Sequence, residues 1–162
     1  MRALIAFLIG VVIALSLFYF IRYYFGNPFR LLFYTVEVKN KSFEETIKAL
    51  EEKLNANGLK VIRVLPLSKA LEGRGVKDFM KYSIILACDI PEKDKILVKV
   101  PSLANLIPCS IAVYEDKESV KVTTLKEIIF LAEESKNMTE EETQFIINTY
   151  RTLRKTLDEV SR

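Results

Sequence analysis

An apolar segment near the N-terminus constrains this chain more than any other feature of its sequence. From Leu4 to Ile21 there are 18 residues without a charge, and a helix of that length spans ~27 Å, close to the hydrocarbon thickness of a bilayer. Thirteen of these residues are Leu, Ile, Val or Phe, which together favour insertion by roughly 4 to 8 kcal/mol. We therefore expect a single-pass transmembrane helix whose partner is the lipid bilayer.

The residues that follow this segment fit the exit of a helix from a membrane. Tyrosine rings sit well at the headgroup level and a long arginine side chain can reach it, so the expected membrane-interface residues are Tyr19, Arg22, Tyr23 and Tyr24. Gly26-Asn27-Pro28 then breaks the helix. The sequence predicts an anchor over residues 1–25, a linker over 26–32 and one α+β domain over 33–160.

A cleaved signal peptide is the alternative to an anchor. Its apolar core has roughly 7 to 15 residues and ends in small residues, whereas this core is longer and runs into Phe18-Tyr19-Phe20-Ile21-Arg22. Basic residues flank the segment on both sides, so the positive-inside rule does not decide its orientation. A very short N-terminal tail carrying Arg2 is compatible with staying inside the cell, which favours a cell-membrane protein with an extracytoplasmic domain.

Without the anchor, the chain is electrically neutral. Three of the 24 basic residues, Arg2, Arg22 and Arg30, flank the apolar segment, so residues 31–162 hold 24 − 3 = 21 basic residues against 21 acidic ones. Nucleic-acid binders normally carry a basic excess on one face, and we expect no nucleic-acid partner. One glutamine among many Lys and Glu residues gives the composition a thermophile-like character.

Hydrophobic periodicity and turn residues divide the domain into strands and helices. The strand patterns cover Phe33 to Val38, Leu59 to Leu65, Lys81 to Cys88, Cys109 to Tyr114 and Ser119 to Thr123. Three helices begin after the N-caps Ser42, Thr124 and Thr139, each with a glutamate three residues on, and two short ones cover 68–72 and 91–97. Strands and helices do not alternate strictly, and the last two strands form a hairpin. We therefore predict an α+β fold with an antiparallel-containing sheet of about four to five strands and helices packed on one face.

Few residues of the domain suit catalysis. The chain has no histidine, so the usual near-neutral proton shuttle and mixed zinc ligand sets are missing, and we expect no metal and no cofactor. Cys88 and Cys109 are the remaining catalytic candidates. Burial as small strand residues explains them, but Cys109 also fits a nucleophile with Cys88 as its partner. In an oxidising compartment, a disulfide between them would contribute about 3 kcal/mol.

The last helix carries one apolar face. Its apolar positions recur at intervals of four and three residues, at Ile146, Tyr150, Leu153, Leu157 and Val160. Such a face packs by default against a sheet, and the repeat is too short to indicate a coiled coil. A homodimer seam through Ile146, Tyr150, Leu153 and Leu157 is the alternative.

Three short segments of the sequence resemble segments of other proteins. They are Asn57-Gly58-Leu59, the stretch from Cys88 to Pro91, and Leu106-Ile107-Pro108-Cys109 running into Val113-Tyr114-Glu115. Together they resemble the bacterial and archaeal family called domain of unknown function 302, over residues 33 to 160. That family usually shows Cys-Asn-Pro where this chain has Cys88-Asp89-Ile90-Pro91, so no role for Cys88 is carried over. The resemblance implies a small α+β fold able to dimerise, with no agreed activity.

Three functional hypotheses follow. The neutral charge, the missing histidine and the lack of a catalytic motif favour a membrane-tethered, non-catalytic domain that binds a partner or an unknown small ligand. The second hypothesis is a thiol-dependent redox or sulfur-handling activity of Cys109 with Cys88. The third is a structural homodimer module joined through the last helix.

Overall fold

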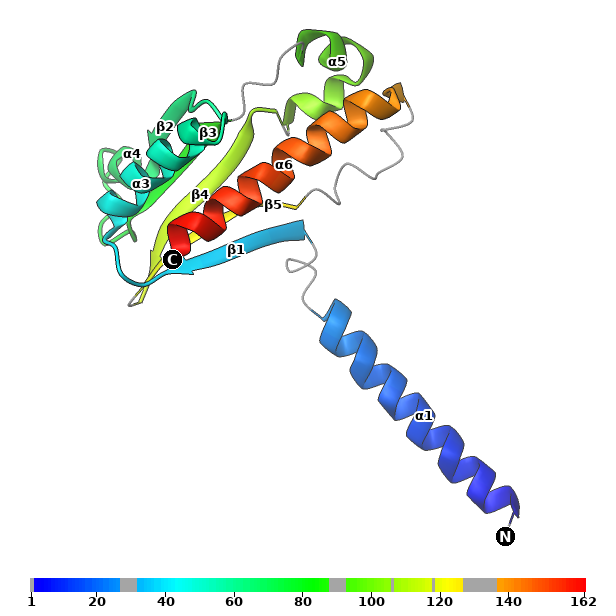
Figure 1. The fold of residues 1–162 in the computed structure, drawn as a ribbon. Helices are drawn as coiled ribbons and strands as arrows, with labels where there is room; N and C mark the ends of the chain where they lie inside the picture. The colour runs from blue at the N-terminus through cyan, green and yellow to red at the C-terminus, as the bar shows by residue number, and fades with distance from the viewer. Residues whose placement is uncertain (1, 27–31, 88–92, 106, 118, 127–136) are drawn as a thin grey trace. The chain divides into compact units, whose positions relative to one another are not determined.

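The chain divides into two units. The computed structural model describes residues 2–26, 32–87, 93–105, 107–117, 119–126 and 137–162. The first unit, Met1–Leu32, contains helix α1 (Arg2–Phe25), and the second, Phe33–Arg162, contains a sheet and the remaining helices (Figure 1). The unit boundary therefore falls immediately before the first strand.

The second unit is built on a five-stranded sheet in the order β1-β5-β4-β3-β2, and every neighbouring pair is antiparallel. The strands are β1 (Phe33–Val38), β2 (Arg63–Pro66), β3 (Tyr82–Ala87), β4 (Cys109–Asp116) and β5 (Ser119–Leu125). Together with the helices packed on the sheet, this confirms the predicted α+β class.

Two long helices, α3 (Phe43–Ala56) and α6 (Glu140–Ser161), lie side by side on one face of the sheet (Figure 1). The shorter helices are α4 (Leu67–Glu72), α5 (Lys93–Lys99) and a 3-10 turn over Pro101–Asn105. The core lies between the long helices and the sheet, where alternate residues of the three middle strands are fully buried, among them Ile85, Val113 and Val122. We call this the helix-covered face and the opposite one the open face.

Local sequence signals set the ends of both long helices. Ser42 and Thr139 each form a complete capping box with the glutamate three residues on, Glu45 and Glu142. Gly58 follows α3 with φ = +76°, a left-handed conformation that glycine adopts without a steric penalty. The helix starts predicted at Ser42 and Thr139 are confirmed.

Two predicted elements differ in the structure. The second strand was predicted over Leu59 to Leu65, but it begins only at Arg63 and extends one residue further, to Pro66. β2 is an edge strand, where a proline is tolerated because its missing N–H costs no ladder hydrogen bond. Thr124 was expected to cap a helix, but it lies within β5 opposite Ile111, and its hydroxyl donates to the Ser110 carbonyl at 3.0 Å. The helix expected to follow it falls on residues 127–136, outside the described residues.

Candidate functional site

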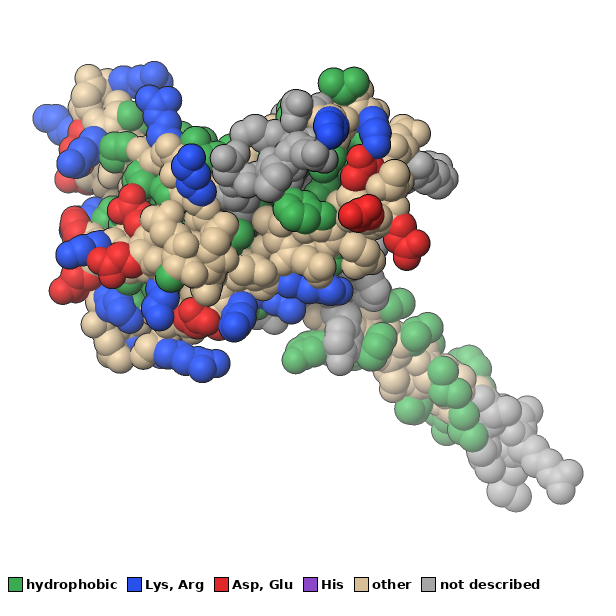
Figure 2. All heavy atoms as spheres, turned by 45° about the horizontal axis from the view of Figure 1, so that its top comes forward, with side chains coloured by type: hydrophobic (Ala, Val, Ile, Leu, Met, Phe, Trp, Pro, Cys, Tyr) green, Lys and Arg blue, Asp and Glu red, His purple; other side chains and the backbone are tan. Residues whose placement is uncertain are grey.

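Apolar side chains surround α1. Every side chain described from Phe7 to Tyr23 is exposed, with Phe7 67% and Val12 62% accessible, and Figure 2 shows the apolar ones in green along this helix. Among the residues that the structure describes, no helix is long and apolar enough to cross a membrane. The expected transmembrane span is therefore not confirmed.

The expected interface residues lie at the C-terminal end of α1. Tyr19 and Tyr23 are 70% and 77% exposed, and Arg22 is exposed between them. The side chain of Tyr24 lies outside the described part of the chain. None of the three described side chains is buried.

Cys109 is disulfide-bonded and fully buried. It begins β4 and pairs with Ala87, the last residue of β3 and the immediate predecessor of Cys88 in the sequence. Cys88 is the chain's only other cysteine and lies outside the described residues. A buried sulfur in a disulfide is not a thiolate nucleophile, so the geometry of Cys109 fits a structural role.

The apolar face of α6 is occupied by the domain itself. Ile146, Leu153 and Leu157 are completely buried, and Tyr150 is 1% exposed. This confirms the default interpretation that the helix packs on the sheet. The dimer seam proposed for these four residues is corrected accordingly, because side chains inside one domain's core are not available to a second copy.

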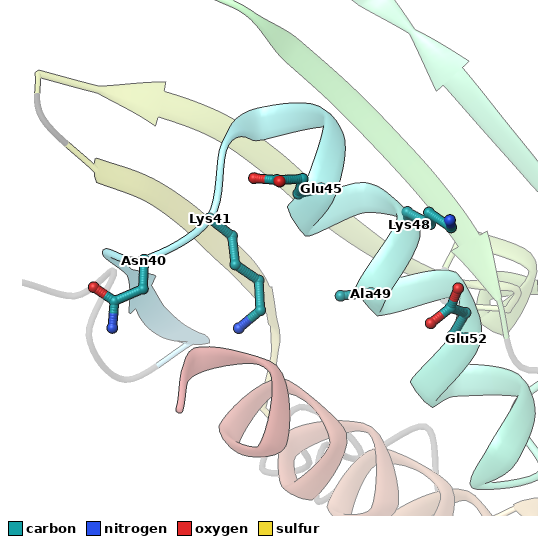
Figure 3. Close-up of a pocket in the computed structure, with 6 residues that line it drawn as sticks. All are labelled: Asn40, Lys41, Glu45, Lys48, Ala49 and Glu52. Carbon is teal, nitrogen blue, oxygen red and sulfur yellow. The ribbon is translucent and has the colours of Figure 1, made fainter.

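One surface groove lies beside α3, lined by Asn40, Lys41, Glu45, Lys48, Ala49 and Glu52, with a volume of about 300 Å³ (Figure 3). Two of its charged side chains form hydrogen bonds to backbone groups at helix ends. The Lys41 ammonium donates to the Val160 carbonyl at 3.0 Å, and Glu45 accepts from the Ser42 amide at 2.8 Å. With charges of both signs and two of them so engaged, this groove offers no concentrated charge for a ligand.

A second hollow lies on the open face of the sheet and has a volume of about 200 Å³. We call it the sheet hollow; it is lined by Phe33, Ile84, Ser110, Ala112, Thr123, Thr124 and Leu125. The strand register explains its composition, because paired residues share a face. Thr35, Thr123, Ala112 and Ile84 form one row across four strands, and Phe33 and Leu125 pair in the next.

Two threonine hydroxyl groups that line the sheet hollow already have partners. Thr123 shares a 2.8 Å hydrogen bond with Thr35, and Thr124 donates to the Ser110 carbonyl. The apolar surface continues from the hollow along the open face to Tyr82 and Tyr114. Their rings stack at 5.7 Å between centroids. The sheet hollow is therefore apolar and suits an apolar ligand.

A tyrosine–carboxylate contact joins the first strand of the domain to its last helix. The Tyr34 hydroxyl on β1 donates to the Asp158 carboxylate on α6, and the Arg154 guanidinium lies 5.6 Å from the Tyr34 ring centre. Burial and the neighbouring Asp158 raise the pKa of Tyr34 above its ordinary value. The phenol thus stays protonated and acts as a structural donor between strand and helix.

The resolved pKa shifts move groups away from neutrality. Hydrogen bonds from Lys81, Lys99 and Lys121 lower the pKa values of Glu44, Glu142 and Asp116 respectively. The same contacts raise the pKa values of Lys81 and Lys121, and burial raises that of Tyr150. Within the described residues, no three Cys, Asp or Glu side chains group as metal ligands. These shifts bring none of the groups toward the pKa range suited to proton transfer near pH 7.

Sequence reasoning missed the sheet hollow and the Tyr34–Asp158 contact. Both depend on partners far apart in the chain, with Thr35 and Thr123 separated by 88 positions and Tyr34 and Asp158 by 124. The available signal was the sequence of β3, Tyr82-Ser83-Ile84-Ile85-Leu86-Ala87, which puts apolar residues on both faces where a one-sided sheet needs them on only one.

Comparison with known proteins agrees with this fold. The family described as "Domain of unknown function DUF302" matches residues 34–160. A crystal structure of an uncharacterized conserved DUF302 protein from Bacillus stearothermophilus aligns with a TM-score of 0.65 and 22% identity, covering 80% of this chain and 98% of that one. At that identity, the likeness shows the fold alone. No curated protein matches the chain.

Proposed function

Because the chain belongs to the DUF302 family, whose description assigns no activity, we propose a function from its own residues: a membrane-tethered domain that binds a ligand or partner without catalysing a reaction. The observation that carries the proposal is the exposure of apolar side chains along α1. A helix that is apolar all round is stable in a protein core or in lipid, and unfavourable in water.

The sequence around α1 supports a bilayer as its environment. The described side chains of α1 begin at Phe7, and the uncharged run in the sequence begins three residues earlier, at Leu4. From there to Ile21 the insertion free energy favours lipid by roughly 4 to 8 kcal/mol. Tyr19, Arg22 and Tyr23 lie at the end of this run, where headgroups accommodate their polar tips.

The titratable residues support binding over catalysis. Hydrogen bonds with lysines lower the pKa values of Glu44 and Asp116, and the bond to Asp116 raises the pKa of Lys121. These shifts move the pKa values of all three groups away from pH 7. The chain has no histidine to substitute for them. The sheet hollow, in contrast, offers an apolar surface suited to a ligand.

The disulfide of Cys109 supports an extracytoplasmic location for the domain. Disulfides persist in oxidising compartments and are rare in the cytosol of mesophiles. An α1 inserted with its short N-terminal tail inside would place residues 33–160 outside. Proteinase K added to spheroplasts tests this orientation: we expect digestion of the domain, and protection until the membrane is lysed would overturn the orientation.

Membrane attachment is tested with the full chain expressed in bacteria. After an alkaline carbonate wash, we expect the protein to remain in the membrane pellet. Val12→Arg/Ile13→Arg should move most of it to the supernatant, because two central arginines cost roughly 5 to 7 kcal/mol. Ile62→Arg/Val98→Arg is the matched control, since both residues are exposed on the second unit. Release of the unmodified chain by the wash would contradict the tether.

A thiol-dependent activity is the second candidate, and the disulfide of Cys109 is the observation that favours it. Redox-active disulfides are exposed or strained and are readily reduced, whereas Cys109 is fully buried. We expect the native disulfide to resist millimolar dithiothreitol for hours and to be reduced within minutes in denaturant. Rapid reduction of the native protein would favour the thiol activity instead.

A further inference from the structure

The open face of the sheet holds an apolar hollow that the tether keeps near the bilayer. We propose that the sheet hollow takes the acyl chain of a membrane lipid, an inference that rests on the proposed tether. Three observations carry it: the chemistry of the lining, the position of the hollow within the sheet, and the length of chain between α1 and Phe33.

The lining selects an apolar ligand. Phe33, Ile84, Ala112 and Leu125 supply carbon surface, and the Thr123 and Thr124 hydroxyls are bonded within the domain. The exposed Ser110 adds one polar side chain to the lining. A polar ligand in this hollow would recover few of the hydrogen bonds that it loses with water. A hydrocarbon chain gains from burial of its surface at no such cost.

The hollow lies on the face that α3 and α6 leave open. Ile84, Ala112 and Leu125 are half-buried within their own strands, while their neighbours on the helix-covered face, such as Ile85 and Val113, are completely buried. The open face therefore keeps apolar surface that a ligand can remove from water. Charged side chains also lie on this face: Lys121 is two positions from the lining residue Thr123 on β5, and it forms an ion pair with Asp116.

The tether limits how far this hollow can move from a membrane. Phe33 lines the hollow and is the first residue of β1. It follows Ile21 by 33 − 21 = 12 positions, and a fully extended chain of that length spans at most about 43 Å. If the segment ending at Ile21 lies in the bilayer, lipid is the most abundant apolar ligand within reach of the hollow, at a high effective concentration.

Photo-labelling of the full chain tests the proposal. The protein is placed in phosphatidylcholine nanodiscs containing a lipid with a diazirine at the end of its acyl chain, illuminated and digested, and labelled peptides are mapped by mass spectrometry. We expect label in α1 and also in peptides containing Phe33, Ala112 or Leu125. Ala112→Trp fills the hollow and should lower the label in those sheet peptides roughly tenfold while α1 stays labelled.

Two further variants keep the test decisive. Val98→Trp adds the same ring at a site on α5 that is 82% exposed, and should leave both sets of labels unchanged. Ala112→Leu fills less volume and replaces Ala112→Trp if the latter loses its cooperative thermal transition.

The possible results separate the inference from the tether. Label confined to α1 overturns the lipid site and leaves the tether standing. In that case a second copy or another part of the chain covers the open face. Label missing from α1 overturns the tether itself. Sheet label that persists unchanged in both Ala112 variants overturns the hollow as the binding site.

Discussion

Asn57 and Thr156 join the end of α3 to the C-terminal third of α6. The Asn57 side-chain amide donates to the Thr156 hydroxyl at 2.9 Å, and this hydroxyl donates to the Thr152 carbonyl at 2.9 Å. Thr156 is completely buried, so its hydroxyl depends on these two partners. The residue that ends α3 by its own backbone geometry thus also fixes the position of α3 against α6.

Replacing Thr156 with valine tests this contact, because valine keeps the shape and removes the hydroxyl. We expect the free energy of unfolding to fall by about 1 to 2 kcal/mol, since the Asn57 amide loses an acceptor in a part-buried site. The control is Thr149→Val: Thr149 makes the same bond to the carbonyl four residues before it, but that bond is exposed to solvent. Urea unfolding that shifts equally in both variants would show that the interhelical bond contributes nothing.

Truncation of Leu153 distinguishes a core residue from a dimer seam. Leu153 is completely buried, so Leu153→Ala should lower the free energy of unfolding by about 2 to 5 kcal/mol. Phe145→Ala on the same helix removes a side chain that is 42% exposed and should cost far less. The loss at Leu153 should also be independent of protein concentration. A midpoint that rises with concentration would instead indicate association through this face.

Stability below neutral pH should depend on Glu142. The hydrogen bond from Lys99 and the Thr139 amide lower its folded-state pKa from the ordinary value of 4.5. A carboxyl with a depressed folded pKa stabilises the fold above its unfolded pKa and loses that contribution as pH falls through the folded value. The difference in unfolding free energy between the native chain and Glu142→Gln should be constant above about pH 5.5 and shrink below about pH 4.5.

Glu141→Gln provides the matched control for this titration. Glu141 lies in the same first turn of α6 and is exposed, so both variants change the charge near the helix N-terminus by the same amount. A pH profile for Glu141→Gln that coincides with that of Glu142→Gln would assign the effect to the helix dipole alone.

The disulfide of Cys109 should stabilise the domain. With Cys88 as the expected partner, the closed loop has 109 − 88 + 1 = 22 residues, for which the chain-entropy argument gives about 3 kcal/mol. Reduction during urea unfolding should lower the midpoint of the native chain and leave Cys88→Ala/Cys109→Ala unchanged. Mass spectrometry of the unreduced digest checks the pairing, and a midpoint insensitive to reductant would count against a stabilising bond.

The sequence alone determined the features that act over a few residues. The capping boxes at Ser42 and Thr139 and the hairpin of the last two strands each satisfy backbone groups within about four positions, so the signal and its partner lie in the same short window. The α+β class followed from the order of these elements. The uncharged segment at the N-terminus is equally local, because its chemistry needs no other part of the chain.

Tertiary structure decided which strands and helices pack against one another. The choice of β5 as the neighbour of β1 places Thr35 opposite Thr123, and no short window contains both. Thr124 lies in a strand although its sequence context favours a helix cap. β5 lies between β1 and β4, so it gains ladder hydrogen bonds on both sides. Tertiary structure also decided that the apolar face of α6 is core and that the open face carries a hollow. Burial is a property of distant neighbours, so only the folded chain could assign it.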